Sequence, residues 1–177
     1  MNVICFGDSN TYGYDPRSYL GGRYDPDSRW VDILAEETGW TVCNLGENGR
    51  EIPASAPVFS ADTDLLIVML GTNDLLQSRS PEQAADRLER FLSSLSLDRS
   101  KILLIAPPPV KRGAWVPDQQ LIDDSRTYAR LCQALAGQLG IRFADAGKWD
   151  IPLAYDGVHF TEQGHRAFAA GLLEVLK

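Results

Sequence analysis

The chain has 177 residues, of which 44% are hydrophobic and 23% are charged, and its formal net charge is −7. This length and composition predict a single globular domain over residues 1–177 with a core of ordinary size, and they exclude a disordered chain. The acidic balance argues against nucleic acid and anionic membranes as partners, because both bind basic faces.

We expect no targeting or membrane segment in this sequence. Its first residues, MNVICF, lack the basic stretch and the long apolar run of a signal peptide, and no later run is long enough to span a bilayer. Cys5, Cys43 and Cys132 are odd in number, stand among apolar neighbours and form no C-x-x-C pair. We therefore expect a cytoplasmic protein with no membrane partner and three buried, reduced thiols.

Apolar, β-branched segments alternate with helical patterns along the chain. Strands are expected at residues 2–6, 40–45, 64–70, 101–106 and 141–144. Helices are expected at residues 30–38, 81–95, 119–139 and 161–176, with Ser28 and Thr161 as N-caps. Strands separated by helices form right-handed crossovers and a parallel sheet covered on both faces. The fold class is therefore α/β: a three-layer α/β/α arrangement around a five-stranded parallel sheet, flavodoxin-like, with strand order 2-1-3-4-5.

The first three predicted strands all end in small, polar loops. These loops are GDSN at residues 7–10, GENG at 46–49 and GTND at 71–74. In open parallel sheets, ligands bind beyond the carboxyl ends of the strands, near the switch in strand order. In this order Ser9, Gly46 and Asn73 fall within about 10 Å, given about 4.8 Å between strands. A hydroxyl, a backbone N–H and a side-chain amide are the components of a nucleophile with its oxyanion hole.

A serine nucleophile needs a base, and the chain has two histidines, His159 and His165. Asp156 precedes His159 by three residues, so in a turn both side chains project to one side, and the carboxylate can orient the imidazole. The segment from Ala144 to His159 reaches about 50 Å when extended, whereas crossing three strand spacings needs only about 15 Å. We expect His159 to serve Ser9, and His165 to be a capping or surface residue on the following helix.

Four sequence blocks carry a family resemblance. FGDSNTYG, NLGENGR, MLGTND and DGVHFTEQGH resemble the blocks of the SGNH or GDSL hydrolases, in the family's order, and GDSNTYGYDP with RWVDILAEE resembles the arylesterase-like branch. The resemblance implies that Ser9 is the nucleophile and that Asp156 and His159 are its partners. It also implies an oxyanion hole from the N–H groups of Ser9 and Gly46 with the side chain of Asn73. The reaction it implies needs no metal and no cofactor.

Five further residues are expected near this site. Asp8 is expected to hydrogen-bond within its own loop, and Asn10 stands where many members of the family have Leu. Val158 precedes His159 and is expected near the pocket. Arg50 follows the glycine loop and either lines the pocket or lies at the surface. Trp115 either covers the site or packs against another subunit of a homo-oligomer.

Two other functions stay open at this stage. An aspartate-based phosphohydrolase would use Asp8, but it needs a second acid where the chain has Asn10, and it leaves Asn73 and the D-x-x-H motif unexplained. A non-catalytic, flavodoxin-like binding module gives no reason for these polar residues to converge.

The expected substrate is a small ester. The chain has no insertion large enough for a lid, and the loops at the rim are short and polar. The exception is the segment 106–118, whose three consecutive prolines make it a stiff wall, which we expect on the acyl side. Acetyl to butyryl esters of aryl or sugar alcohols are therefore the expected substrates.

Overall fold

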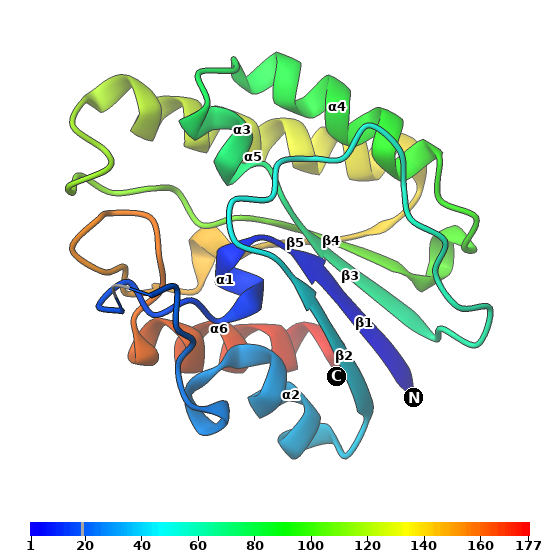
Figure 1. Cartoon of the computed structure of the whole chain (residues 1–177). Helices are drawn as coiled ribbons and strands as arrows, with labels where there is room; N and C mark the ends of the chain where they lie inside the picture. The colour runs from blue at the N-terminus through cyan, green and yellow to red at the C-terminus, as the bar shows by residue number, and fades with distance from the viewer. Residues whose placement is uncertain (19) are drawn as a thin grey trace.

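A five-stranded parallel sheet in the order β2-β1-β3-β4-β5 forms the middle layer of the computed structural model, which describes residues 1–18 and 20–177 (Figure 1). The strands are β1 (Asn2–Gly7), β2 (Thr41–Gly46), β3 (Leu65–Met69), β4 (Ile102–Ala106) and β5 (Arg142–Asp145). Every neighbouring pair is parallel. The predicted fold class and strand order are confirmed, and the strand boundaries differ from the predicted ones by about one residue.

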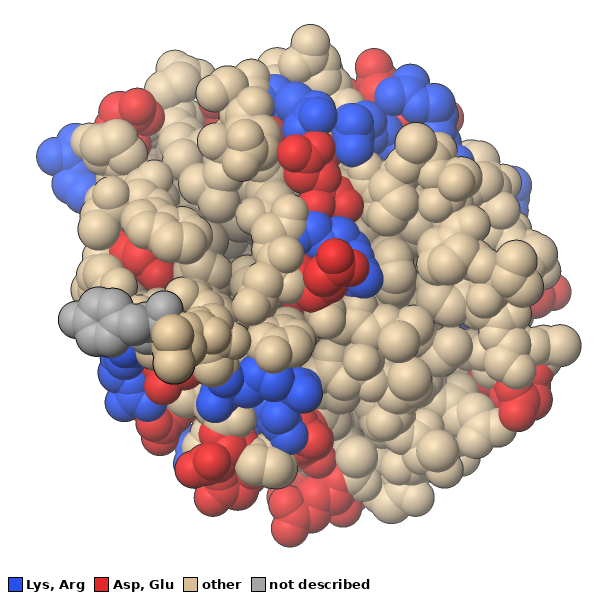
Figure 2. Space-filling model, viewed as in Figure 1, with Lys and Arg blue, Asp and Glu red and all other residues tan. Residues whose placement is uncertain are grey.

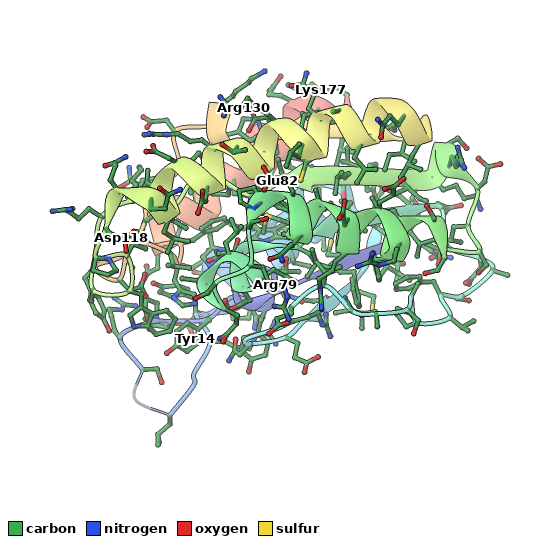
Figure 3. The ribbon with its side chains drawn as sticks, turned by 90° about the horizontal axis from the view of Figure 1, so that it is seen from above. Tyr14, Arg79, Glu82, Asp118, Arg130 and Lys177 are labelled. Atoms are coloured by element: carbon green, nitrogen blue, oxygen red, sulfur yellow. The ribbon has the colours of Figure 1, made fainter. Side chains whose placement is uncertain are left out.

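Helices cover both faces of the sheet (Figure 1). One face carries α2 (Trp30–Thr38) and α6 (Glu162–Leu176), and the other carries α4 (Pro81–Ser93) and α5 (Gln119–Leu139). Figure 3 shows α4 and α5 side by side above the strands. Shorter helices follow the strands and loops: α1 (Ser9–Tyr12), α3 (Thr72–Leu76), η1 (Pro26–Ser28), η2 (Arg99–Lys101) and η3 (Ala146–Lys148).

The central strands are buried on both faces, as their continuous apolar runs predict. In β3 all five residues are buried. Leu66 and Val68 pack into the core beneath α4 and α5, whereas Leu65, Ile67 and Met69 pack into the core beneath α2 and α6. This division follows from the two-residue period of a strand, which points successive side chains to opposite faces.

The helix starts follow their capping residues, with one correction. Ser80 and Gln83 form a reciprocal capping box at the start of α4, and Thr161 accepts a hydrogen bond from the N–H of Gly164 at the start of α6. Ser28 is not the N-cap of α2, because it lies inside η1 and Arg29 takes the N-cap position without a side-chain hydrogen bond. α2 itself begins at Trp30, as predicted, so only the capping residue differs.

The edge strand β2 corrects the prediction for one cysteine. Cys5 and Cys132 are free and buried, but Cys43 is exposed. Along β2, exposed and partly buried residues alternate, so Thr41, Cys43 and Leu45 share an uncovered face. The apolar neighbours of Cys43 in the sequence predicted burial on both faces, and the structure leaves one face of this edge strand without a covering helix.

Charged side chains of both signs lie on the surface. On the face shown in Figure 2, basic and acidic side chains are interspersed. Among the helices of residues 1–18 and 20–177, none combines the length and the apolar character needed to cross a membrane.

His165 is a core residue, so the prediction of a capping or surface role is wrong. Its side chain is 0% exposed and packs edge-on against the rings of Tyr24 and Phe160, at centroid distances of 5.4 and 5.2 Å. Neither ring nitrogen has a hydrogen-bond partner among the described residues. Burial, together with the nearby charge of Arg29, lowers the pKa of His165 to about 3.

This burial predicts acid sensitivity through His165. The pKa of His165 is lower in the folded chain than in the unfolded chain, so between about pH 3 and pH 6.5 the unfolded chain binds more protons. The stability contributed by neutral His165 is therefore complete above about pH 6.5 and is lost as the pH falls below that value. The variant His165→Phe keeps an aromatic ring in the cluster, and its urea midpoint should fall less than that of the wild type between about pH 7.5 and pH 5. Equal losses for both proteins would contradict this account.

Candidate active site

Ser9 lies where β1 ends and α1 begins, at the carboxyl edge of the sheet. Asp8 is the N-cap of α1, and its carboxylate accepts a hydrogen bond of 3.0 Å from the N–H of Asn10, as the sequence predicted. Ser9 is the first residue of α1, and its own N–H therefore has no acceptor within the helix. Burial raises the pKa of Asp8 to about 6, and the side chain does not line the cavity beside Ser9.

Three side chains from the two ends of the chain form a continuous hydrogen-bonded row. The hydroxyl of Ser9 lies 2.9 Å from Nε2 of His159, and Nδ1 of His159 lies 2.7 Å from Oδ2 of Asp156. All three side chains are buried. The other carboxylate oxygen of Asp156 accepts the N–H groups of Val158 and His159, at 2.8 and 2.9 Å. These contacts leave Nδ1 of His159 as the donor to Asp156 and Nε2 as the acceptor for the Ser9 hydroxyl.

The pKa of Asp156 agrees with its place in this hydrogen-bonded row. Burial raises the pKa of its carboxyl, but the hydrogen bonds from the His159 ring and from the N–H groups of His159 and Val158 outweigh burial. The pKa of Asp156 therefore lies below its ordinary value, and the carboxylate is charged at neutral pH. A buried carboxylate at this position holds one orientation of the imidazole and stabilises its protonated form.

Asn10 joins the two loops that carry these residues. Its side-chain N–H donates to the carbonyl of Val158 at 3.2 Å, and its side-chain oxygen accepts the N–H of Phe160 at 2.9 Å. The indole of Trp30 in turn donates to the carbonyl of Asn10 at 2.9 Å. Neither Asn10 nor Val158 lines the cavity; Val158 packs with Val110, Val116 and Ile122. Both residues therefore lie next to the site, as predicted, but behind the residues that line the cavity.

A cavity of about 280 Å³ opens in front of the Ser9 hydroxyl. It is lined by Ser9, Tyr14, Asn48, Gly49, Asn73, Trp115 and His159. Asn73 lies on α3, directly after β3, and one of its side-chain N–H groups donates to the carbonyl of Arg50 at 3.0 Å. A carboxamide has two donors, and the second side-chain N–H of Asn73 has no acceptor among the residues that the structure describes. The structure thus brings Ser9, His159 and Asn73 together as the sequence predicted.

Gly46 is wrongly assigned by the sequence, and Gly49 takes its place at the cavity. The N–H of Gly46 donates to the side-chain oxygen of Asn44 at 2.8 Å, and Gly46 does not line the cavity. A Cβ on Gly46 would lie 2.0 Å from the backbone nitrogen of Tyr12, so glycine is needed here for α1 to pack on β2. Gly49 lines the cavity with φ of 74°, and its N–H has no acceptor among the described residues.

Arg50 neither lines the cavity nor lies free at the surface. Its guanidinium stacks over the ring of Phe6 at 4.3 Å and donates to the carbonyls of Gly7, at 2.9 Å, and Leu45. It also pairs with Glu47 at 2.6 Å. Of the two positions left open for Arg50, the pocket and the surface, the structure shows neither: its side chain lies under the loop and contacts the ends of β1 and β2.

Two aromatic side chains flank the imidazole of His159. The ring centroid of Tyr14 lies 4.7 Å from that of His159, and the Trp115 ring lies edge-on at 5.0 Å. Trp115 is 51% exposed. Of the two roles predicted for Trp115, a cover for the site agrees with this position. Tyr14 was not predicted at the site, because nothing in the local sequence shows that the segment after α1 folds back beside a loop 145 residues later.

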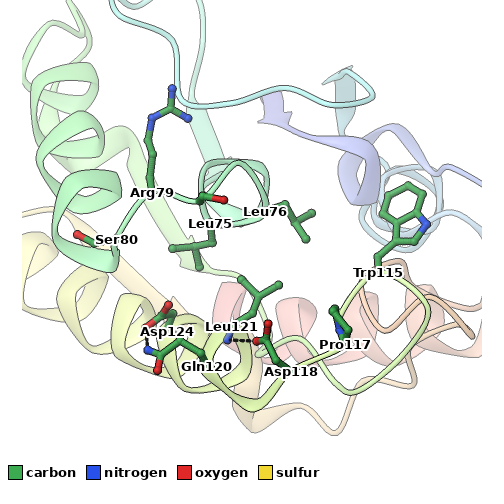
Figure 4. A pocket seen from close by; sticks show the side chains of 11 residues that line it. Leu75, Leu76, Arg79, Ser80, Trp115, Pro117, Asp118, Gln120, Leu121 and Asp124 are labelled. Atoms are coloured by element: carbon green, nitrogen blue, oxygen red, sulfur yellow. Dashed lines mark hydrogen bonds between the residues drawn. The ribbon is translucent and has the colours of Figure 1, made fainter.

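A second cavity of about 490 Å³ adjoins the first and shares Trp115 with it (Figure 4). Its apolar side chains include Leu75, Leu76 and Leu121, and its polar side chains include Asp118, Gln120 and Asp124. Arg79 also borders this cavity and extends toward the segment that follows β2. Among the described residues, no group of three His, Cys, Asp or Glu side chains is placed to hold a metal ion.

Comparison with known proteins places these observations in one family. The model of the GDSL-like lipase/acylhydrolase family matches residues 5–167. The GDSL esterase/lipase CPRD49 of Arabidopsis thaliana is 26% identical over 82% of this chain, which spans 66% of that protein, slightly less than two thirds. A carbohydrate acetylesterase family member from Sinorhizobium meliloti has 26% identity and a TM-score of 0.82, with 99% of this chain and 96% of that chain covered. The native aryl esterase of M. smegmatis has 27% identity and a TM-score of 0.81, covering 99% and 97%.

The bridge made by Asn10 predicts a large loss of stability on its removal. In the variant Asn10→Ala the buried N–H of Phe160 and carbonyl of Val158 lose their partner, which costs about 1–3 kcal/mol for each group. The free energy of unfolding, measured by urea denaturation, should fall by roughly 2–5 kcal/mol. Asn48→Ala, at an exposed position, is the matched control and should change it by less than about 0.5 kcal/mol. Similar losses in both variants would show that the bridge is not special.

Proposed function

The chain belongs to the GDSL-like lipase/acylhydrolase family, in its arylesterase-like branch, and from this premise we propose that it is a serine esterase for short-chain carboxylic esters of aryl or sugar alcohols. The observation that carries the proposal is the row from Ser9 through His159 to Asp156, at 2.9 and 2.7 Å, at the edge of a cavity of substrate size. A binding module would have no need of this row.

The proposed reaction has two steps. Oγ of Ser9 attacks the ester carbonyl carbon while Nε2 of His159 takes the hydroxyl proton, and the imidazolium then passes that proton to the leaving alcohol. Water, deprotonated by His159, attacks the acyl-enzyme and releases the acid and Ser9. Asp156 keeps Nδ1 of His159 protonated and stabilises the imidazolium in both steps.

The carbonyl oxygen becomes an oxyanion in each step and needs hydrogen-bond donors. We assign the N–H groups of Ser9 and Gly49 and the second side-chain N–H of Asn73 to this role. The assignment is supported by three facts: all three residues line the cavity, the N–H groups of Ser9 and Gly49 have no acceptor among the described residues, and Asn73 is already fixed by its bond to the carbonyl of Arg50. Donors fixed in advance stabilise developing charge without a cost of reorganisation.

The size of the cavity supports short acyl groups. The aromatic rings of Tyr14 and Trp115 bound the 280 Å³ cavity beside His159, and the adjoining 490 Å³ cavity has room for the rest of an ester. The structural relatives named as a carbohydrate acetylesterase and an aryl esterase indicate the same two kinds of ester.

Removing the nucleophile is the test of the proposed function. Ser9→Ala should reduce p-nitrophenyl acetate hydrolysis to a very small fraction of the wild-type rate, because no other hydroxyl contacts Nε2 of His159 among the described residues. Wild-type protein, without added metal, should be labelled at Ser9 by a fluorophosphonate, and the variant should not. Far-ultraviolet circular dichroism provides the control for folding. An active, folded Ser9→Ala protein would refute the assignment.

Acyl-chain length tests the substrate class separately. We expect kcat/KM for p-nitrophenyl esters to be highest between the acetyl and butyryl esters and to fall steadily for longer chains, because the aromatic walls limit the space beside Ser9. The measurement is a series of acyl groups from two to sixteen carbons at a fixed enzyme concentration. A maximum at eight carbons or more would contradict the short-chain assignment and leave the serine mechanism intact.

A further inference from the structure

The segment that carries Gly49 is an irregular loop, so side chains elsewhere must hold it. It follows β2 and has no regular secondary structure between Glu47 and Asp64. Gly49 itself adopts φ of 74°, and the neighbouring backbone contact is a turn between the N–H of Arg50 and the carbonyl of Glu47. A loop of this kind is mobile unless its peptide groups are bound by other elements.

Three peptide groups just after Gly49 are bound by side chains of α3 and α4. Asn73 donates to the carbonyl of Arg50 at 3.0 Å, and Asp74 accepts the N–H of Ile52 at 2.9 Å. The guanidinium of Arg87, on α4, donates to the carbonyl of Ile52. Asn73 and Asp74 are consecutive residues of α3, so one short helix holds the loop at two points.

Asp74 and Arg87 act as a pair. Nε of Arg87 lies 2.9 Å from Oδ1 of Asp74, whose side chain is 0% exposed. Burial raises the pKa of Asp74, while the Ile52 N–H and the charges of Arg87 and Arg79 oppose this rise. Arg79 also pairs with Glu51 of the same loop at 2.7 Å. A buried carboxylate needs a charged partner. Here that partner, Arg87, also donates to the carbonyl of Ile52, whose N–H donates to Asp74.

We propose that Asp74 and Arg87, which we call the clamp, are positioning residues that set the oxyanion hole by fixing the peptide groups of Ile52. This inference rests on the proposed function. Arg50 connects the clamp to the cavity, because it is next to Gly49 and its carbonyl fixes the Asn73 side chain. A shift of Ile52 would therefore displace two of the three assigned donors, the N–H of Gly49 and the amide of Asn73. A displacement of about 1 Å at a reacting group can cost on the order of 100-fold in rate.

Arg87→Lys is the variant that tests the clamp. Lysine keeps a positive charge beside Asp74, so the buried carboxylate is not left without a partner, but it lacks the planar fork that reaches both Asp74 and the Ile52 carbonyl. We expect kcat for p-nitrophenyl acetate to fall about 10–100-fold with KM within about twofold, because the clamp affects the transition state and not ground-state binding. The rate constant for labelling by a fluorophosphonate should fall in parallel. Arg126→Lys, which alters an exposed ion pair with Asp123 on α5, is the matched control and should change neither quantity.

A double-mutant cycle separates positioning from simple stabilisation. Asn73→Ala alone should lower kcat by roughly 10²–10³-fold. If the clamp acts through the oxyanion hole, Arg87→Lys should have a clearly smaller effect in the Asn73→Ala background than in the wild type. Multiplicative effects, or a lowered melting temperature with unchanged kcat, would overturn the clamp and leave the esterase intact. A wild-type protein that neither hydrolyses esters nor reacts with the fluorophosphonate would overturn both proposals.

Discussion

The candidate site depends on one interaction across the whole chain, the bridge from Asn10 to the backbone of residues 158–160. Ser9 follows the central strand β1, whereas His159 lies in an irregular segment after the edge strand β5. The bridge joins these segments directly behind the pair, where Nε2 of His159 lies 2.9 Å from the Ser9 hydroxyl, and the hydrogen bond from the Tyr24 hydroxyl to the carbonyl of Phe160 supports it. Asn10 suits this position because one carboxamide supplies a donor for Val158 and an acceptor for Phe160. Since both partners are buried, the bond cannot be exchanged for water without cost.

On the opposite side of the cavity, charged side chains hold an irregular loop in place. The loop after β2 has no regular structure, and three of its peptide groups, at Arg50 and Ile52, are bound by Asn73, Asp74 and Arg87. The two sides of the site are thus held differently: a neutral amide joins the loops of Ser9 and His159, and a charged pair from α3 and α4 holds the loop of Gly49. Polar side chains behind the cavity therefore satisfy backbone groups that hydrogen bonds of regular secondary structure satisfy elsewhere in the fold.

The sequence predicted most where the chemistry is local and failed where it depends on neighbours in space. The D-x-x-H spacing placed Asp156 and His159 together, and a three-residue separation in a turn is enough to explain this. The GENG segment contains two glycines, and the predicted oxyanion donor was Gly46. The structure shows that Gly46 still belongs to β2, in register with Gly7, where its N–H is taken by Asn44 and its missing side chain makes room for α1. His165 was predicted near the surface because its burial against Tyr24 joins residues 141 positions apart.

By itself, the sequence determined the alternation of strands and helices, the parallel sheet, the family and the pairing of Ser9 with His159 and Asp156. These follow from periodicity, from strand ends that meet at one edge and from short motifs, all of which a linear chain records directly. Only the tertiary structure decided which glycine faces the cavity, that Arg50 lies beneath the loop and that Tyr14 and Trp115 enclose the imidazole. The physical reason is that the group packed against an N–H or an aromatic ring decides whether that N–H or ring can face the cavity. In this fold, that group comes from a distant part of the chain.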